Sequence, residues 1–253
     1  VHKELPFLLK EMINKEIIPC IPEHGGVGAS GDLVQLAHLA LVLIGEGEVL
    51  YDGEILATSE VFSKLSIQPM SIHLREGLAV MNGTSAMTGI SLVNLLTANR
   101  ILKWAVMLSA MSNEVVSAFD DHFSYELNSV KKHDGQNQIA KMIRNILSDS
   151  KMIRKRSEHF YNPANIDKDI VDVKVQEYYS LRCVSQVLGP VYDTILNAEN
   201  TILNELNSVN DNPVIDHVNQ DVYHGGNFHG DYVSLEMDKL KIAITKLSML
   251  SER

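Results

Sequence analysis

Residues 23–49, EHGGVGASGDLVQLAHLALVLIGEGEV, decide how this chain folds. A glycine-rich loop over residues 25–31 leads directly into a segment that is apolar on nearly every side. A helix without a polar face is usually buried between other helices, and aspartate is a preferred residue at a helix start. The stretch therefore predicts a tight loop, followed by a buried helix that Asp32 caps.

Helical spacing of apolar side chains dominates the rest of the chain. It predicts helices over residues 5–18, 75–81, 84–119, 136–149, 174–208 and 231–252. Asp52-Gly53 lies between two short β-prone runs, which is typical of a hairpin turn. We find no internal repeat, and we expect a mainly α protein: a single core built as a bundle of long helices, with a small β-hairpin.

The composition favours a small-molecule partner. The net charge of −10 is spread over 253 residues, which argues against nucleic-acid binding. No apolar run is long enough to cross a membrane. Cys20 and Cys183 form no paired motif, so we expect neither a disulfide nor a zinc site, and a reducing cytoplasm is the simplest compartment. The irregular spacing of His217, His224 and His229 likewise predicts no metal.

One motif in the loop is misleading. Residues 26–31, GVGASG, match the G-x-G-x-x-G pattern of dinucleotide sites. Pro19 and Pro22 stand where such a site needs a central parallel strand, and proline cannot donate the hydrogen bonds of that strand. Asp52, at the distance of a ribose-binding acid, belongs to the hairpin turn, so no nucleotide cofactor is expected. A plain flexible connection capped by Asp32 remains an alternative.

Ala29-Ser30-Gly31 permits a different chemistry. A glycine amide nitrogen can attack the carbonyl two residues upstream when the backbone is held in a tight bend, and only glycine folds so closely. Loss of two water molecules, one of them from the serine side chain, would leave an exocyclic methylidene group. Such a group is an electrophile that no ordinary side chain supplies.

Residues 23–49 resemble the signature of the aromatic amino acid ammonia-lyases, which build a 4-methylidene-imidazol-5-one (MIO) group from an Ala-Ser-Gly triplet. Further similar motifs follow in the family's order: EGLAVMNGTSAMTG (76–89), KKHDGQ (131–136), VQEYYSLRCVSQVLGPV (175–191), NSVNDNPVID (207–216) and YHGGNF (223–228). The resemblance implies the long-helix bundle of the fumarase/aspartase-like lyases and an MIO group formed from residues 29–31, without metal or nucleotide. It also implies a homotetramer.

The resemblance also implies roles for individual residues. Arg182 would clamp the substrate carboxylate, for which its planar fork is well suited. Asn82 would lie against the MIO group and the polar end of the substrate, and Phe228 would pack near the electrophile. Tyr179 would handle a proton or help to assemble the group. Gln176 falls on the same predicted helix face as Tyr179 and Arg182, so we add it to the substrate-binding residues.

We expect non-oxidative elimination of ammonia from L-tyrosine, giving trans-4-coumarate. Histidine ammonia-lyase, giving urocanate, and phenylalanine ammonia-lyase are near alternatives, and a non-catalytic helical scaffold is the alternative from another class. Family members extend beyond both ends of residues 1–253 and contribute their base tyrosine from such a segment. We therefore interpret the chain as a fragment with little or no lyase activity by itself.

Overall fold

The computed structural model describes residues 1–27, 32–160 and 175–252. Helices dominate, which confirms the mainly α prediction: α1 (Glu4–Asn14), α2 (Leu33–Leu43), α3 (Thr58–Leu65), α4 (Glu76–Met81), α5 (Ser85–Val115), α6 (Tyr125–Ser129), α7 (Asp134–Ile146), α8 (Arg156–Phe160), α9 (Tyr179–Arg182), α10 (Val184–Leu206) and α11 (Asp231–Glu252). A 3-10 turn covers Asp121–Phe123. The strands are β1 (Ile18–Pro19), β2 (Glu48–Tyr51), β3 (Glu54–Ala57), β4 (Val214–Asp216) and β5 (Asp221–Tyr223).

Two compact units make up the chain. Unit 1 comprises Val1–Ser91 and Ile202–Ser234, and unit 2 comprises Leu92–Thr201 and Leu235–Arg253. The long helices α5, α10 and α11 therefore each contribute residues to both units. The single helical core expected from the sequence stays a prediction.

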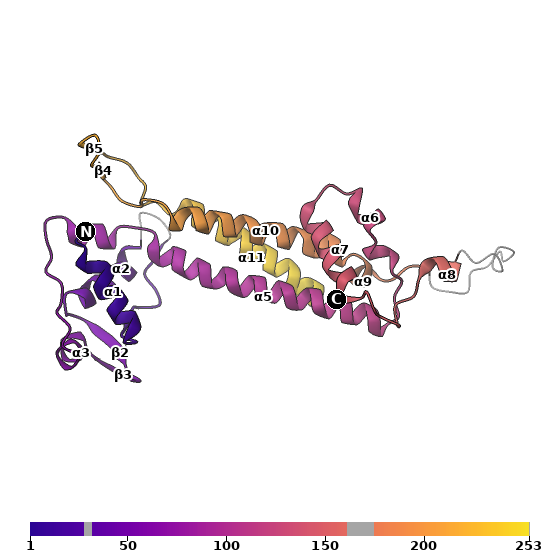
Figure 1. The fold of residues 1–253 in the computed structure, drawn as a ribbon, viewed down its shortest axis with the longest axis horizontal. Coiled ribbons are helices and arrows are strands. Elements are labelled where there is room, and N and C mark those ends of the chain that lie inside the picture. Colours follow the sequence, from indigo (N-terminus) through magenta and orange to yellow (C-terminus); the bar gives the residue numbers. More distant parts are fainter. Residues whose placement is uncertain (28–31, 161–174, 253) are drawn as a thin grey trace. The chain divides into compact units, whose positions relative to one another are not determined.

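Unit 1 contains a small antiparallel sheet with the strand order β1-β2-β3, beside α1, α2 and α3 (Figure 1). The predicted hairpin is confirmed, with Tyr51 opposite Glu54 across the turn. Asp52 and Gly53 both have positive φ angles, 56° and 84°, as the right-twisted two-residue hairpin turn requires. Buried apolar side chains from these elements form the core of unit 1: Leu8, Met12, Ile17, Val42, Leu43, Val49, Val61, Phe62 and Ile67.

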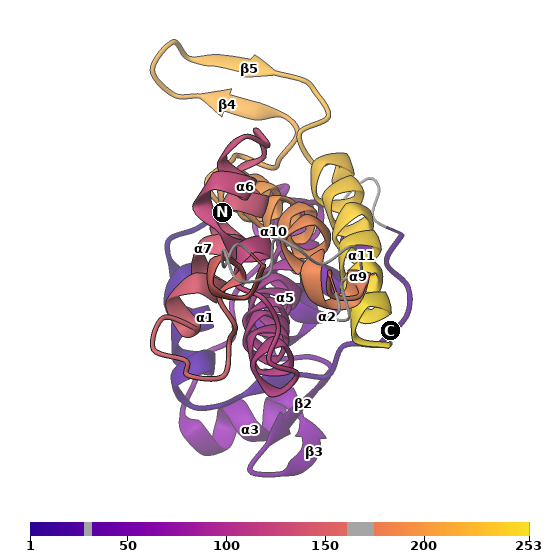
Figure 2. The ribbon, with the colours of Figure 1, turned by 90° about the vertical axis from the view of Figure 1, so that its right-hand side faces the viewer.

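More β-structure is present than the sequence predicted. Ile18 and Pro19, expected only to end the first helix, pair with Leu50 and Val49 as a short edge strand. An edge strand tolerates proline because only one of its sides needs hydrogen bonds. β4 and β5 form a separate two-stranded ribbon in a region for which the sequence predicted no strand (Figure 2). Both additions are short and leave the helical class of the fold unchanged.

In unit 2, the contributions of α5, α10 and α11 run alongside one another (Figures 1 and 2). The buried apolar side chains of α10 in this unit alternate in steps of four and three: Val184, Leu188, Val191, Ile195 and Ala198. This narrow seam is the spacing of a coiled coil, in which one apolar stripe faces the neighbouring helices. α5 buries a similar stripe of Leu95, Ala98, Leu102, Val106 and Ala110.

The predicted helix over residues 174–208 is wrong at its start and in its continuity. Residue 174 lies outside the described part of the chain and residues 175–178 are not helical. Two helices follow, α9 and α10, which meet at Cys183. Gln176 precedes α9, so it does not share a helix face with Tyr179 and Arg182. The apolar spacing of Leu181, Val184 and Leu188 continues across Cys183, so periodicity alone does not predict the interruption of the helix there.

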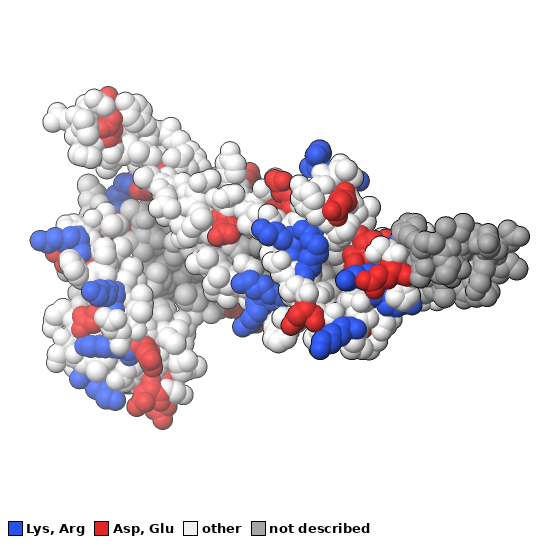
Figure 3. Space-filling view, turned by 45° about the vertical axis from the view of Figure 1, so that its right-hand side comes forward, with Lys and Arg blue, Asp and Glu red and all other residues white. Residues whose placement is uncertain are grey.

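Charged side chains of both signs are mixed over the face shown in Figure 3. Among the described residues, no helix is both long and apolar enough to cross a membrane.

A close backbone contact joins α7 to α10 within unit 2. A Cβ atom added to Gly135 would lie 2.2 Å from the carbonyl oxygen of Gly189 and 2.6 Å from Oδ1 of Asp193. A Cβ atom added to Gly189 would lie 2.6 Å from the backbone nitrogen of Gln136. Both positions therefore require glycine, since no side chain fits between the two helices.

Replacing Gly135 with alanine is expected to lower the free energy of unfolding by about 1–3 kcal/mol, the usual cost of forcing an extra carbon into a packed interior. Gly89→Ala is the matched control, because an added Cβ there meets nothing within 4 Å and alanine favours a helix. Urea unfolding of the two variants measures the difference. Equal midpoints would show that the α7–α10 contact is looser than described.

Candidate active site

The predicted catalytic triplet, Ala29-Ser30-Gly31, lies outside the described residues, but both flanks of the loop are described. On the upstream side, Gly25 has a φ angle of +136°, and an added Cβ would lie 2.8 Å from Cγ1 of Val34. A Cβ added to Gly26 would lie 2.3 Å from Nε2 of Gln35. The upstream part of the loop therefore folds back closely against the first turn of α2.

On the downstream side, Asp32 fixes the end of the loop. It is 3% exposed, its backbone N–H donates to the carbonyl of Gly83 at 2.8 Å, and its carboxylate accepts from the N–H of Met87 at 2.7 Å. Burial raises the pKa of Asp32, while hydrogen bonds from the backbone of Met87 and Ala86 act in the opposite direction.

The capping role predicted for Asp32 therefore needs correction. Asp32 precedes α2, but its side chain does not cap that helix. It instead accepts a hydrogen bond from the first turn of α5, where backbone N–H groups lack partners within the helix. The two described flanks of the triplet are therefore held against α2 and α5, respectively.

Asn82 ends α4 in the short turn that leads to α5, and its N–H donates to the carbonyl of Leu78 at 2.8 Å. Its side chain is half-buried. Next to this turn, Thr84 donates to Oε1 of Glu205 at 2.5 Å, and the side chain of Asn210 donates to both. Asn82 therefore stands in a turn that is tied on one side to Asp32 and on the other to the segment after α10.

Asp211 and Asn212, in the segment after α10, contact the start of α4 and the loop of Phe228. Arg75 contacts both carboxylate oxygens of Asp211, at 3.1 and 3.2 Å. Burial works against ionisation of Asp211, but the hydrogen bonds from Arg75 lower its pKa overall. Further along, the Asn212 side chain accepts from the N–H of Gly225 at 2.9 Å, and Phe228 follows half-buried before α11. Within unit 1, hydrogen bonds thus connect the downstream flank of the triplet, the turn of Asn82 and the loop of Phe228.

Unit 2 contains the other three predicted site residues. The guanidinium of Arg182 lies 4.7 Å from the centre of the Tyr179 ring, and its Nε donates to the carbonyl of Glu177 at 2.9 Å. Tyr179 is 74% exposed and lines an open groove of about 480 Å³ together with Cys183 and Lys246. Gln176 is exposed and precedes this pair by one short turn. Tyr179 and Arg182 are therefore brought together at this groove.

A buried polar network that the sequence did not predict holds the backbone next to Arg182. The Asn113 side chain donates to the carbonyl of Leu181 at 3.3 Å, and its oxygen faces Nε2 of His122 at 3.0 Å. Asn128 donates to the carbonyl of His122 at 3.2 Å, and Gln136 donates to Asn128 at 3.0 Å. Local patterns could not reveal this network, because its members are far apart in sequence and unremarkable singly.

The sequence also missed a cluster of His2, His73 and Glu76 in unit 1. From the sequence we consider only His217, His224 and His229 as metal ligands. The spacing His-x-x-Glu at a helix start was the one available signal for this cluster.

Asp32→Ala is expected to lower the free energy of unfolding by about 1–2 kcal/mol, because the N–H of Met87 loses its acceptor. Asp32→Asn keeps an acceptor oxygen and is expected to retain most of the stability.

The carboxyl of Asp32 has a raised pKa in the folded state. The folded state therefore holds this proton to higher pH than the unfolded state, in which the pKa of aspartate is about 3.9. Stability contributed by the protonated form is therefore lost as pH rises through the folded pKa, and the Asn variant should not show this loss. Urea unfolding over an acidic pH series tests both points.

His122 gives a pH dependence of opposite sign. Burial lowers its pKa from 6.5 to about 4, although the nearby carboxylate of Asp121 acts against this. Between these values the unfolded chain takes up a proton that the folded chain does not, so stability falls as pH drops from 6.5 towards about 4. His122→Gln is expected to flatten this dependence in urea unfolding, whereas the exposed His133→Gln should not. An unchanged slope in the His122 variant would contradict a buried neutral imidazole.

The chain is similar throughout its length to known proteins. The profile described as aromatic amino acid lyase matches residues 1–253. A histidine ammonia-lyase of Shouchella clausii is 39% identical over 253 residues, covering 100% of this chain and 48% of the relative. A tyrosine 2,3-aminomutase of a Myxococcus species is 40% identical over 256 residues, covering 97% of this chain and 48% of the relative.

Solved structures agree with this similarity. The tyrosine aminomutase of Streptomyces globisporus superimposes with a TM-score of 0.90 at 34% identity, covering 98% of this chain and 48% of that protein. The phenylalanine aminomutase of Pantoea agglomerans gives a TM-score of 0.89 at 38% identity, over 96% of this chain and 47% of that protein. The chain thus spans about half the length of the relatives it matches. The expected lyase fold is confirmed, and the chain belongs to the aromatic amino acid lyase family.

Proposed function

We propose that the protein containing this chain eliminates ammonia from an aromatic L-amino acid, with L-tyrosine as substrate and trans-4-coumarate as product. The proposal rests above all on the loop of residues 25–32, whose two described flanks are held against α2 and α5 as a strained triplet requires. Membership of the family supports the reaction class. The choice of tyrosine rests on the wording of the motifs NSVNDNPVID and YHGGNF.

In this proposal Ala29-Ser30-Gly31 form the MIO group, which supplies an electron-poor carbon for activating the substrate. Asp32 contributes by fixing the backbone that leaves the triplet, since its own N–H and its carboxylate are both hydrogen-bonded within unit 1. A backbone ring closure needs atoms held within bonding distance, and small misplacements cost orders of magnitude in rate.

The other residues bind and orient the substrate. Arg182 binds the carboxylate, because its fork can form two parallel hydrogen bonds to a carboxylate and its Nε is already held by the carbonyl of Glu177. Asn82 contacts the polar end of the substrate, and Phe228 packs against its apolar part. Gln176 assists in polar binding. Elimination breaks the Cα–N bond and removes a proton from Cβ, and Tyr179 is proposed for proton handling or for assembly of the electrophile.

A homotetramer is part of the proposal. The described part of α5 exposes many large apolar side chains along its outer surface: Ile90, Val93, Leu96, Ile101, Trp104, Met107, Leu108, Met111 and Val115. An apolar surface of this length on a helix is typical of an interface that another copy covers. We also propose a cytoplasmic location, on the single ground that Cys20 and Cys183 form no paired motif.

A second candidate is aminomutase chemistry, in which the amino group moves from Cα to Cβ instead of leaving. Relatives that are 39–40% identical include proteins named tyrosine 2,3-aminomutase as well as histidine ammonia-lyase. Elimination of ammonia is a step that both reactions can share, and they differ in whether ammonia is released. The product therefore distinguishes the two.

The full-length protein is tested with L-tyrosine, L-phenylalanine and L-histidine in parallel. We expect a conjugated acid from tyrosine, seen by absorbance and chromatography, and an intact mass lower by two water molecules. Ser30→Ala should restore the unmodified mass and reduce the rate at least about a thousandfold, since the electrophile cannot form. Ser148→Ala is the control, because Ser148 is an exposed serine that follows the end of α7.

The alternatives give different results. A β-amino acid from tyrosine would establish the aminomutase, and urocanate from histidine would establish the histidine enzyme. Full activity of Ser30→Ala with an unmodified wild-type mass would overturn the proposal and leave a helical scaffold.

A further inference from the structure

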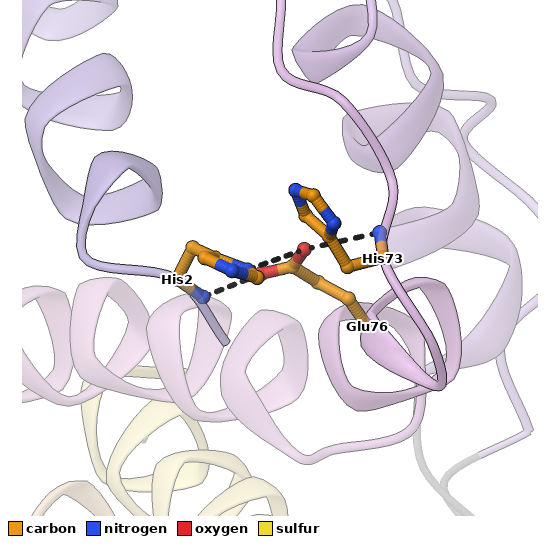
Figure 4. A group of neighbouring side chains, drawn as sticks. All are labelled: His2, His73 and Glu76. Carbon is orange, nitrogen blue, oxygen red and sulfur yellow. Dashed lines mark hydrogen bonds and ion pairs between the residues drawn. The ribbon is translucent and has the colours of Figure 1, made fainter.

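A cluster of two histidines and one glutamate lies in unit 1 and includes none of the predicted site residues. Glu76 is the first residue of α4 and only 6% exposed, whereas His2 and His73 are exposed. Figure 4 shows the Glu76 carboxylate between the two histidines. The His2 ring nitrogen Nδ1 is 3.1 Å from each carboxylate oxygen, and the two imidazole rings lie 4.1 Å apart.

The carboxylate is held in place by backbone groups. The N–H of His2 donates to Oε1 at 2.5 Å, and the N–H of His73 donates weakly to Oε2 at 3.4 Å. The hydrogen bond from the His2 backbone is the main cause that lowers the pKa of Glu76. A buried, oriented carboxylate with two neighbouring imidazoles is a preorganised set of donors.

The distances suit a small divalent metal. One ligand atom from each of the three residues lies within 4.8 Å of the other two. Zinc binds imidazole nitrogen and carboxylate oxygen at about 2.0–2.2 Å, which separates neighbouring ligands by roughly 3.3 Å in a tetrahedron. Nδ1 of His2 and the Glu76 carboxylate already stand at 3.1 Å. The His73 side chain is exposed, so its ring can change rotamer without displacing a packed neighbour.

The site is also accessible. His2 and His73 both line an open groove of about 600 Å³, together with Phe7, Ser71 and other residues of unit 1. An ion can enter from the groove, and a fourth ligand position would face it. Two imidazoles with a carboxylate favour zinc-like ions, whereas magnesium and calcium prefer oxygen ligands alone.

We propose that His2, His73 and Glu76 bind one divalent transition metal ion of the zinc class, with at least one coordination position open to the groove. The ion would join the segment before α1 to the first turn of α4. Because α4 ends next to Asn82, metal binding would stabilise the turn on which that residue stands.

The full-length protein, purified without a histidine tag and treated with a chelator, is titrated with zinc chloride. We expect one zinc ion per chain in equilibrium dialysis and a rise in the melting temperature, because a ligand that binds only the folded state stabilises it. Magnesium chloride should give neither. His73→Ala and His2→Ala should each weaken zinc binding at least about tenfold.

His217→Ala is the matched control, since His217 is also exposed but lies outside the cluster. Glu76→Gln serves as a further variant if it folds, while the two exposed histidines keep the test independent of folding. Zinc binding that persists at one ion per chain in both histidine variants would overturn the proposal, as would its absence from the wild-type protein.

Discussion

The hydrogen bond from the Met87 N–H to the buried carboxylate of Asp32 connects the loop of the predicted triplet to the start of α5. The candidate site depends on both segments. Residue 32 directly follows the triplet, and residue 87 belongs to the first turn of α5. A carboxylate that is 3% exposed is costly without partners, so this contact constrains the position of both segments. A second hydrogen bond, from the Asp32 N–H to the carbonyl of Gly83, attaches the same residue to the turn before α5.

Polar residues between the helices extend this constraint. Asn210, Asp211 and Asn212 each contact a different segment: the turn after Asn82, the start of α4 and the loop of Phe228. Short polar side chains are suited to this because they reach backbone groups without filling much volume. The segment of residues 210–212 therefore connects three parts of unit 1 that are far apart in the sequence.

Much of the fold could be predicted from the sequence, because long helices with regular apolar spacing are the strongest local signal. The hairpin at Asp52-Gly53 followed from turn chemistry. The break at Cys183 could not be predicted, since cysteine is no helix breaker and the apolar spacing continues in phase across it. The role of Asp32 was misassigned for a physical reason: capping rules consider the adjacent helix, but its partner is 55 residues away. The residues of the site were identified through the family's motifs, and local physics alone would have assigned most of them to turns and surface faces.

The contact between Gly135 and Gly189 limits how unit 2 can move. Helices separated by side chains can slide by small shifts as rotamers readjust, which is the usual basis of shear motion. Here the backbones of Gly135 and Gly189 lie in contact beside the Asp193 side chain, so rotamer changes can absorb little of a displacement. We therefore expect a rearrangement around Arg182 to leave the contact between α7 and α10 in place.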